Sequence, residues 1–387
     1  MTPKEMLTNK SFCPIPWTGF YIGPDGEVKN CICSLESIGN TNNTPIQKVL
    51  HGEVNTQVKS EILANKKPNT CSYCYNLETN KKSHDIVSSR VYYLKELRTV
   101  PKETYLQPEN FNLHQIDIRW RNTCNFACVY CGPVLSSKWA NELNVTVPFP
   151  SQERFNELKE YVFSHAKQLK NVYMAGGEPL LIKENEELLE LLLEKNPTVE
   201  LRINTNLSKT NTKILDLLCK FKNVHWTLSA ESINEEFEYM RYGGKWAEFV
   251  ENFELIKTLP HKITFNMVWC VLNYNGIFDC IDYFRNTGVH PNAFILTATL
   301  GPGWLDTRHL PDSVLQSIES QLLERINERP GFLLEDGYRN LLAHIKKPFN
   351  KDTKGIFQQL TEIDQRRNLD SSKIFKELYN IKENYHG

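Results

Sequence analysis

Apolar and polar residues follow two different patterns along this chain, and the first of them predicts short strands. Over the first 80 residues the apolar positions come in brief alternating stretches, and two of these, 17–22 and 27–32, flank the tripeptide Pro24-Asp25-Gly26. This tripeptide favours a tight turn, because proline presets its φ angle and glycine tolerates a positive one. We therefore expect a β-hairpin within a small module of strands and turns.

The second pattern begins near residue 110, where short apolar runs alternate with longer amphipathic segments. Six of the apolar runs are expected to be strands: 116–120, 172–174, 199–204, 224–229, 262–271 and 292–297. The helices expected between them cover residues 184–195, 210–220, 234–259 and 276–286. Such a succession predicts an α/β fold with a parallel sheet, here a partial (β/α)6 barrel of the TIM type. In barrels of this kind the chemistry lies at the C-terminal ends of the strands.

Together the two patterns predict four segments along the chain. These are an N-terminal hairpin module over residues 1–80, a helical linker over 81–109, the partial barrel over 110–302 and a helical region over 303–387. In the last region Asp312-Ser313 is a candidate helix cap, and Pro330 and Pro348 are candidate stops.

Composition and charge then narrow the class of protein. Of 387 residues, 40% are hydrophobic and 24% charged, as in an ordinary globular protein. The 45 basic and 46 acidic side chains give a net charge of −1, so we expect no general attraction to nucleic acid. No apolar run is long enough to span a bilayer, and residues 1–5 lack the apolar core of a signal peptide. These features predict a cytoplasmic protein with no membrane partner.

The eleven cysteines are the unusual feature of the composition. A long chain without a secretion signal is not expected to need disulfides. One group of cysteines lies near the N-terminus: Cys13, Cys31, Cys33, Cys71 and Cys74. A tight triplet follows much later: Cys124, Cys128 and Cys131. Cys219, Cys270 and Cys280 stand singly in apolar stretches and are typical of buried packing. Two clusters and three single thiols predict metal ligation at two places.

The triplet follows directly after the first barrel strand, so its three thiolates can converge from one loop. A [4Fe–4S] cluster normally takes four thiolates, and three would leave one iron open to another ligand. Zinc is the alternative, although a structural zinc site needs four ligands and no fourth lies nearby in the sequence.

With Tyr130 just before its last cysteine, the triplet resembles the signature of the radical SAM superfamily. The resemblance implies that Cys124, Cys128 and Cys131 hold a [4Fe–4S] cluster whose open iron binds S-adenosylmethionine (SAM). It also implies that one electron cleaves SAM to methionine and a 5′-deoxyadenosyl radical, with a flavodoxin or ferredoxin as electron donor. The likeness extends over residues 110–302.

Two motifs after the triplet support the same resemblance. Gly176-Gly177-Glu178-Pro179 ends the second strand and matches the family's GGEP motif, which implies contact with the methionine part of SAM. Taken alone, the same four residues also fit a surface turn. Asn204 and Asn206 end the third strand, where the family commonly has a Thr-Asn pair close to the site.

Further candidate cofactor contacts follow at the next two strands. The resemblance implies ribose contacts for Ser229 and Glu231 and a pairing of Arg241 with the SAM carboxylate, although all three also fit a solvent-exposed surface. The fifth strand departs from the family, because the adenine-side GxIxG pattern is not visible there, and we place the adenine contact at Val271 and Asn273. Cys270 on this strand is a candidate hydrogen donor to a substrate radical, as in radical epimerases, or a buried thiol.

The N-terminal cysteines resemble the auxiliary-cluster modules called twitch and SPASM. Cys13, a gap, Gly26, four residues and Cys31 repeat their hairpin pattern, and Cys71-Ser-Tyr-Cys74 follows. The resemblance implies a second [4Fe–4S] cluster on Cys13, Cys31, Cys71 and Cys74, with Cys33 as an alternative ligand. The position before the barrel is a departure, since relatives usually carry the module after it. From spacing alone, a zinc ribbon fits equally well.

The resemblance predicts an enzyme that removes a hydrogen atom from an organic substrate. Oxidation, isomerisation and bond formation all stay open. Twitch-bearing members act on small molecules such as sugars, aminocyclitols and nucleotides, whereas SPASM members often modify peptides. Since no separate peptide-recognition domain is visible in the sequence, we favour a sugar or nucleotide. The alternatives are a peptide-modifying maturase and a non-enzymatic zinc ribbon with a barrel scaffold.

Overall fold

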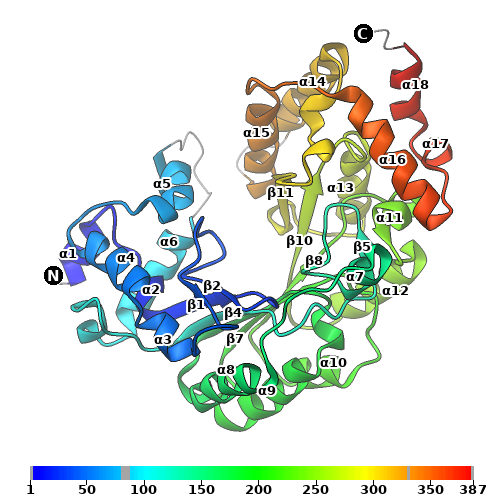
Figure 1. Cartoon of the computed structure of the whole chain (residues 1–387). Coiled ribbons are helices and arrows are strands. Elements are labelled where there is room, and N and C mark those ends of the chain that lie inside the picture. Colours follow the sequence, from blue (N-terminus) through cyan, green and yellow to red (C-terminus); the bar gives the residue numbers. More distant parts are fainter. Residues whose placement is uncertain (1–2, 80–87, 329–331, 385–387) are drawn as a thin grey trace. The chain divides into compact units, whose positions relative to one another are not determined.

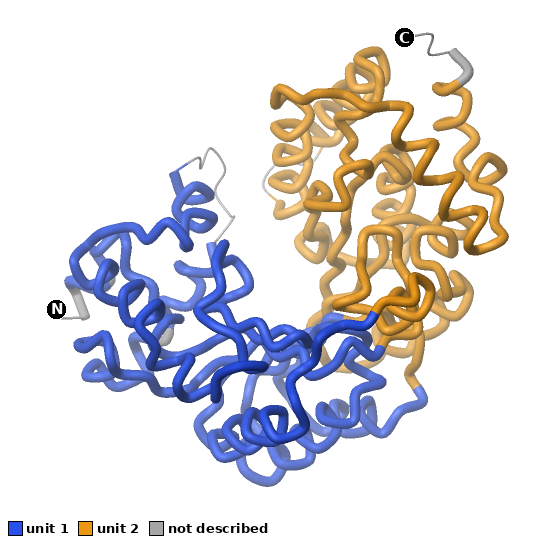
Figure 2. The backbone as a smooth tube through the Cα atoms, in the orientation of Figure 1, with its two compact units in different colours: residues 1–123, 146–204, 211–225 blue, residues 124–145, 205–210, 226–387 orange. Residues whose placement is uncertain are grey.

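The computed structural model describes residues 3–79, 88–328 and 332–384. It divides into two compact units, coloured separately in Figure 2. Unit 1 comprises Met1–Thr123, Thr146–Asn204 and Asn211–His225. Unit 2 comprises Cys124–Val145, Thr205–Thr210 and Trp226–Gly387. Each unit draws on more than one of the four segments expected from the sequence, and the boundaries of those segments stay a prediction.

Unit 1 is built on a mixed sheet in which the N-terminal hairpin and the βα strands are continuous. Its strands are β1 (Gly19–Ile22), β2 (Glu27–Lys29), β3 (Gly39–Asn40), β4 (Gln115–Ile118), β6 (Asn171–Met174) and β7 (Glu200–Thr205). They lie in the order β7-β6-β4-β1-β2-β3. β4, β6 and β7 are parallel, and β1 joins β4 in parallel with Phe20 opposite Ile116. The hairpin expected to form a separate module is therefore an extension of the parallel sheet.

The predicted hairpin itself is confirmed. β1 and β2 pair antiparallel, with Ile22 opposite Val28. Gly26 has a φ of +80°, and its amide donates to the carbonyl of Gly23 at 3.0 Å. The turn thus uses glycine where a left-handed backbone is required.

Nine helices are described in unit 1, and several were not expected from the sequence. They are α1 (Pro3–Thr8), α2 (Ile15–Thr18), α3 (Ile46–Leu50), α4 (Glu53–Leu63), α5 (Ser72–Thr79), α6 (Ser89–Tyr93), α8 (Gln152–Ser164), α9 (Lys183–Lys195) and α10 (Lys213–Leu218). The expectation of strands and turns throughout the first 80 residues is wrong at α1 and α2 and again from residue 46 onward. In α4, Val58 and Ile62 are buried one turn apart, a helical period between polar residues that short-range alternation hides. The helical linker predicted over 81–109 lies partly outside the described residues, which show α6 within it.

Unit 2 contains the last strands and most of the C-terminal helices. β8 (Val224–Leu228) begins in unit 1 and ends in unit 2, where it lies beside β10 (Lys262–Trp269), which pairs in parallel with β11 (Phe294–Ala298). A separate two-stranded sheet joins β5 (Ala127–Cys128) to β9 (Arg241–Tyr242). The helices of unit 2 are α7 (Ser137–Leu143), α11 (Asn234–Met240), α12 (Trp246–Lys257), α13 (Gly276–Asn286), α14 (Asp312–Glu328), α15 (Leu333–Ile345), α16 (Thr353–Arg367), α17 (Ser371–Ile374) and α18 (Lys376–Asn384).

One long helix expected in this unit is interrupted. The sequence predicts a helix over residues 234–259, but β9 and the glycines after it separate α11 from α12. Gly243 has a φ of +105°, which ends helical geometry, and the two residues of β9 pair with β5 instead.

The predicted fold class is confirmed. Each of the six expected strands is present within two residues of its predicted bounds, and strands alternate with helices along the chain (Figure 1). This is the α/β succession of a partial (β/α)6 barrel. No helix within the described ranges combines the length and the apolar character that crossing a lipid bilayer requires.

Candidate functional site

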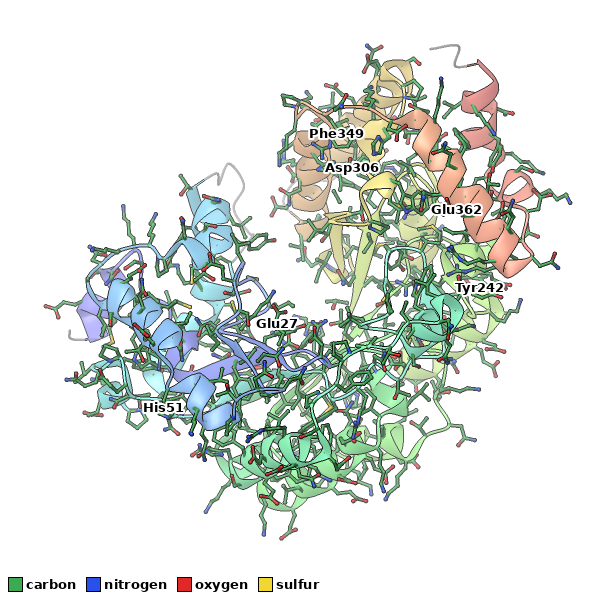
Figure 3. The ribbon with its side chains drawn as sticks, viewed as in Figure 1. Glu27, His51, Tyr242, Asp306, Phe349 and Glu362 are labelled. Carbon is green, nitrogen blue, oxygen red and sulfur yellow. The ribbon has the colours of Figure 1, made fainter. Side chains whose placement is uncertain are left out.

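The cysteine triplet in unit 2 is held by hydrogen bonds to its backbone from three separate elements. Cys128 lies in β5 opposite Arg241 of β9. Its carbonyl accepts from the Trp139 indole of α7 at 2.7 Å. The neighbouring Ala127 carbonyl accepts from Arg367 of α16 at 2.9 Å. Arg367 is almost fully buried, and its guanidinium lies 4.4 Å from the ring centroid of Tyr242, which is labelled in Figure 3.

Nitrogen donors point at two of the three sulfurs. The Cys124 Sγ accepts from the Phe126 amide at 3.4 Å and from Asn206 Nδ2 at 3.9 Å. The Cys128 Sγ accepts from Arg241 Nη1 at 3.8 Å. Burial raises the pKa of the Cys128 thiol to about 12, and the Arg241 charge acts in the opposite direction. Donors of this kind stabilise the thiolate form, which is the form that ligates metal.

The thiols of the triplet are not grouped around a single point. Cys124, Cys128 and Cys131 form no disulfide. Across the part of the chain that the structure describes, no three Cys, His, Asp or Glu side chains are grouped as ligands of one metal ion. A zinc ion needs its ligands around one point. In a [4Fe–4S] cluster, by contrast, each thiolate binds a different iron, so the sulfurs need not meet.

A buried ion pair, with a tyrosine hydroxyl bound to it, lies next to Cys128. Arg241 Nη2 pairs with Glu231 Oε2 at 2.6 Å, and the Tyr130 hydroxyl donates to Glu231 Oε1 at 2.5 Å. Glu231 is 0% exposed and Arg241 4%, so the solvent-exposed alternative for these two residues is wrong. Burial raises the pKa of Tyr130, and the Glu231 carboxylate raises it further. Arg241 Nε is buried without a hydrogen-bond partner, which leaves one donor available to a ligand.

The GGEP residues of unit 1 form a tight, buried turn after β6. Gly176 and Gly177 have φ angles of +76° and +56°. A Cβ at Gly177 would lie 2.2 Å from the Thr123 carbonyl oxygen, which in turn accepts from the Glu178 amide at 2.8 Å. The Glu178 side chain is 0% exposed and accepts from the Leu180 amide at 3.1 Å. Glu178 therefore caps the following turn, and an exposed surface turn is excluded.

The other predicted cofactor contacts of strands β7 and β8 have different surroundings. Asn204 Oδ1 is buried without a hydrogen-bond partner among the described residues. Asn206 donates to Asn125 Oδ1 at 3.2 Å and accepts from the Ser208 amide at 2.9 Å, in addition to its contact with Cys124. Ser229 is partly exposed, and its amide donates to the Thr205 carbonyl at 3.1 Å. The roles assigned to these residues from the sequence stay predictions.

The candidates at the end of β10 are fully buried. Asn273 accepts from the Cys270 amide at 2.8 Å and donates to the carbonyls of Glu231 and Val268 at 2.8 and 3.0 Å. These hydrogen bonds fix the Asn273 side chain at the end of β10, and both of its Nδ2 hydrogens are already donated. Val271 and Cys270 are each 0% exposed, and burial raises the pKa of Cys270 to about 12. The adenine contact and the hydrogen-donor role of Cys270 stay predictions.

The five N-terminal thiols gather into one group within unit 1. Cys33 lies 3.6 Å from the Ser89 hydroxyl and interacts electrostatically with the thiols of Cys31 and Cys74. Cys31 and Cys71 pack against the buried cluster that contains Cys13. Burial, with the charge of Cys74, raises the pKa of Cys71 to about 12. All four expected ligands and the alternative Cys33 are therefore neighbours.

Comparison with protein families identifies the chain. Residues 118–277 match the model of the radical SAM superfamily. The chain contains a radical SAM domain. Residues 13–75 of this radical SAM enzyme match a second model, SPASM, which describes an iron–sulfur cluster-binding domain. Its cofactors are accordingly a [4Fe–4S] cluster, SAM and an auxiliary iron–sulfur cluster.

Curated relatives of this radical SAM enzyme carry two names. A GTP 3′,8-cyclase from Nautilia profundicola is 24% identical over 67% of this chain and 80% of its own. A GTP 3′,8-cyclase from Sulfurimonas denitrificans is 25% identical over 43% of this chain and 50% of its own. A 7-carboxy-7-deazaguanine synthase from Clostridium acetobutylicum is 36% identical over 23% of this chain and 36% of its own. The match thus spans half or less of the last two relatives.

Solved structures similar to this chain include enzymes with SAM or peptide bound. The structure described as native anSMEcpe with bound AdoMet is 16% identical over 56% of this chain and 60% of its own, with a TM-score of 0.43. Streptococcus suis SuiB bound to its precursor peptide SuiA is 14% identical over 76% of this chain and 67% of its own, with a TM-score of 0.42.

The residues present fit the cofactors of the radical SAM family. Three thiols, two of them with nitrogen donors, suit the cluster, and the unpartnered Arg241 Nε suits a carboxylate. The glycines of the GGEP turn let the backbone lie where a side chain would not fit. Sequence reasoning missed Trp139 and Arg367, which hold the cysteine loop. No local motif marks either residue, since Arg367 is 236 positions beyond Cys131 (367 − 131) and only folding brings it to the loop.

Proposed function

We propose that this radical SAM enzyme removes a hydrogen atom from a small molecule, a sugar or a nucleotide. The observation that carries the proposal is the cysteine loop, whose sulfurs meet the donors Arg241 and Asn206. When bound, the cluster supplies one electron to the sulfonium of SAM, and the C–S bond breaks to give methionine and a 5′-deoxyadenosyl radical that takes hydrogen from a substrate C–H bond.

The chain's own residues supply charge and shape to this chemistry. Arg241 places a positive charge beside Cys128, and Glu231 holds that guanidinium at 2.6 Å in a site closed to water. Because both residues are buried, their interaction is screened little by solvent and keeps the guanidinium in one orientation. Gly177 allows the turn after β6 to approach the backbone of Thr123.

The names of the curated relatives support a nucleotide or sugar as substrate. GTP 3′,8-cyclase and 7-carboxy-7-deazaguanine synthase are both named for purine compounds, and one GTP 3′,8-cyclase matches 67% of this chain. A purine nucleotide contains both the base and the sugar phosphate that such an enzyme would recognise. We further propose a flavodoxin or ferredoxin as the electron donor and the cytoplasm as the site of action.

The decisive experiment measures SAM cleavage with and without one cluster thiol. The protein is reconstituted anaerobically with iron and sulfide, then mixed with SAM and dithionite, and 5′-deoxyadenosine is quantified. We expect formation by the parent protein, none by Cys128→Ala, and unchanged formation by the matched control Cys219→Ala, whose thiol is exposed. A parent protein that binds zinc and releases no 5′-deoxyadenosine would overturn the proposal.

A further inference from the structure

Four polar side chains form a row across the parallel sheet of unit 1. The register places Tyr21 of β1 opposite Asp117 of β4, Asp117 opposite Tyr173 of β6, and Tyr173 opposite Arg202 of β7. Residues opposite one another in neighbouring strands point to the same face of a sheet. The row therefore consists of Tyr21, Asp117, Tyr173 and Arg202, side by side on one face.

This face is opposite to the one that α8 covers, and of the helices only α6 reaches it in the contacts described below, through Tyr92 at Arg202. Phe20, next to Tyr21, has its ring 6.5 Å from that of Tyr161 in α8. The residues that flank the row along their strands, such as Ile116 and Val172, are fully or almost fully buried and apolar. Because successive side chains alternate between faces, the row points away from α8 and α9, which lie together on one side of these strands (Figure 1).

A second guanidinium extends the row at β4. Arg119 lies two residues after Asp117, donates to its carboxylate through Nε at 3.3 Å, and has its guanidinium 4.8 Å from the ring centroid of Tyr21. The GGEP turn packs against this side chain, since a Cβ at Gly176 would lie 2.5 Å from the Arg119 Cβ. Packing therefore fixes the aliphatic part of the Arg119 side chain. Only one of its guanidinium nitrogens donates a hydrogen bond to a residue that the structure describes.

Arg202, at the other end of the row, is held in one orientation, but not all of its hydrogen-bond donors have a partner among the described residues. Its Nη2 donates to the Tyr92 hydroxyl at 2.6 Å and to Glu200 at 3.3 Å, and its guanidinium stacks 4.8 Å from the Tyr92 ring centroid. Its Nε is buried and has no partner in the described part of the chain. Asn204, further along the same strand and on the same face, likewise has a buried Oδ1 without a partner. Buried polar atoms normally find a hydrogen-bond partner, so unpartnered ones call for an explanation such as a ligand.

The row and Arg119 together carry two positive charges and one negative charge, while Glu27 and Lys29 at the β2 end pair with each other. Arg119 and Arg202 stand against the single carboxylate of Asp117, and Glu200 is shared between Arg202 and Lys95. An arginine fork is the side chain best suited to bind phosphate or carboxylate oxygens. Tyr173, between the two arginines, makes no hydrogen bond with a described residue, so its hydroxyl is available to a ligand hydroxyl.

We propose that this row binds the substrate through a phosphorylated sugar, with phosphate oxygens on Arg202 and Arg119 and sugar hydroxyls on Asp117 and Tyr173. Asp117 and Arg202 lie two strands apart, at a separation of about 10 Å. Tyr173 lies on the strand between them. The inference rests on the proposed function and deepens it, because it assigns substrate recognition to named residues. The N-terminal hairpin would then also contribute to substrate binding, because Tyr21 of β1 belongs to the row and its ring contacts Arg119.

The test measures equilibrium binding of three probes to the reconstituted protein: GTP, ribose 5-phosphate and unphosphorylated ribose. We expect Arg202→Met to weaken binding of the phosphorylated probes at least tenfold, and Arg202→Lys to weaken it less. Tyr173→Phe is expected to weaken binding about threefold, as one hydrogen bond is lost. Arg154→Met is the matched control, since Arg154 of α8 pairs with Glu157 on the helix surface. GTP bound more tightly than ribose 5-phosphate identifies a nucleotide, and equal binding identifies a sugar phosphate.

Two results would overturn the inference without touching the proposed function. One is phosphorylated probes that bind the parent no better than ribose does. The other is phosphorylated probes that bind Arg202→Met as tightly as the parent. In either case SAM cleavage by dithionite in the absence of substrate would continue, since no residue of the row belongs to the cysteine loop. Loss of that cleavage in the parent would instead contradict the proposed function.

Discussion

At the scale of single residues, the surroundings of each thiol decide what it can do. Cys128 faces a guanidinium at 3.8 Å, whereas Cys219 is exposed and Cys280 is fully buried. A thiolate needs nearby donors or positive charge, and only the first of these three thiols has them within hydrogen-bond reach. The same reasoning applies to the N-terminal group, where five thiols compete for the four ligand positions of one cluster.

Cys33 is the residue on which we base a first prediction. If Cys13, Cys31, Cys71 and Cys74 hold the auxiliary cluster, Cys33→Ser will keep about eight irons per chain after anaerobic reconstitution, from two clusters of four. Cys71→Ser is the positive control and should retain about four. Iron and sulfide analysis, with the electron paramagnetic resonance spectrum of the reduced protein, measures both. Because Cys33 contacts Cys31 and Cys74, iron lost from Cys33→Ser but kept by Cys31→Ser would assign Cys33 as the ligand.

At the scale of elements, the ends of the strands carry the chemistry because the backbone there adopts conformations that most residues avoid. The turn after β6 uses two consecutive glycines with positive φ, and it packs against Thr123 on one side and Arg119 on the other. A positive φ is costly for any residue with a Cβ. The GGEP residues are therefore required by the fold as well as by the cofactor.

A second prediction follows for this turn. Gly177→Ala should destabilise the protein by more than about 2 kcal/mol, because the left-handed backbone costs about 1–2 kcal/mol and the new Cβ would also meet the Thr123 carbonyl. Gly303→Ala is a matched control, since a Cβ there has no neighbour within 4 Å. Thermal unfolding followed by circular dichroism measures both variants. Equal midpoints for the two would show that the turn relaxes around the methyl group.

At the scale of the whole molecule, the C-terminal helices place acidic side chains next to α11 in unit 2. Asp364 of α16 accepts from the Tyr239 hydroxyl of α11 at 2.9 Å and from the Ser371 hydroxyl at 2.6 Å. Asp279 of α13 and Glu377 of α18 both act on the carboxyl group of Glu236 in α11. Acidic side chains of α11, α13 and α18 therefore act on one another, and Asp364 of α16 binds α11 at a different residue, Tyr239.

A third prediction concerns the pH dependence of stability. Burial, with the charges of Asp279 and Glu377, raises the pKa of Glu236 to about 7. Since the unfolded chain has a lower value, near 4.3, the folded state binds this proton more tightly. The stabilising effect of the proton is fully present below pH ~4.3 and is lost as pH rises through 7, at a cost of roughly 3–4 kcal/mol.

Replacing Glu236 by glutamine should remove this dependence. Glu236→Gln is expected to raise the thermal midpoint at pH 8 and to change it little at pH 5. The exposed neighbour Glu235 provides the control Glu235→Gln, with no pH-dependent difference from the parent. An equal midpoint for Glu236→Gln and the parent at pH 8 would contradict the assignment.

The sequence by itself determined the secondary structure of the βα region and the kind of chemistry. Strand β10 was predicted from residue 262, where it begins, and helix α13 was predicted over its full length. Apolar runs and amphipathic periods are local signals, so the chain carries them at each position. The cysteine triplet could also be predicted from the sequence, because its ligands come from eight consecutive residues. Helix α4 was not predicted although its helical period is local, whereas the break at β9 depends on tertiary pairing with β5.

The tertiary structure alone decided which distant residues act together. It joined β1 to β4 in register and so placed Tyr21 beside Asp117. It buried Arg241 against Glu231, and it brought Arg367 to the Ala127 carbonyl. The physical reason is that pairing register and the burial of charge depend on contacts between segments far apart in sequence, which no local pattern of side chains encodes.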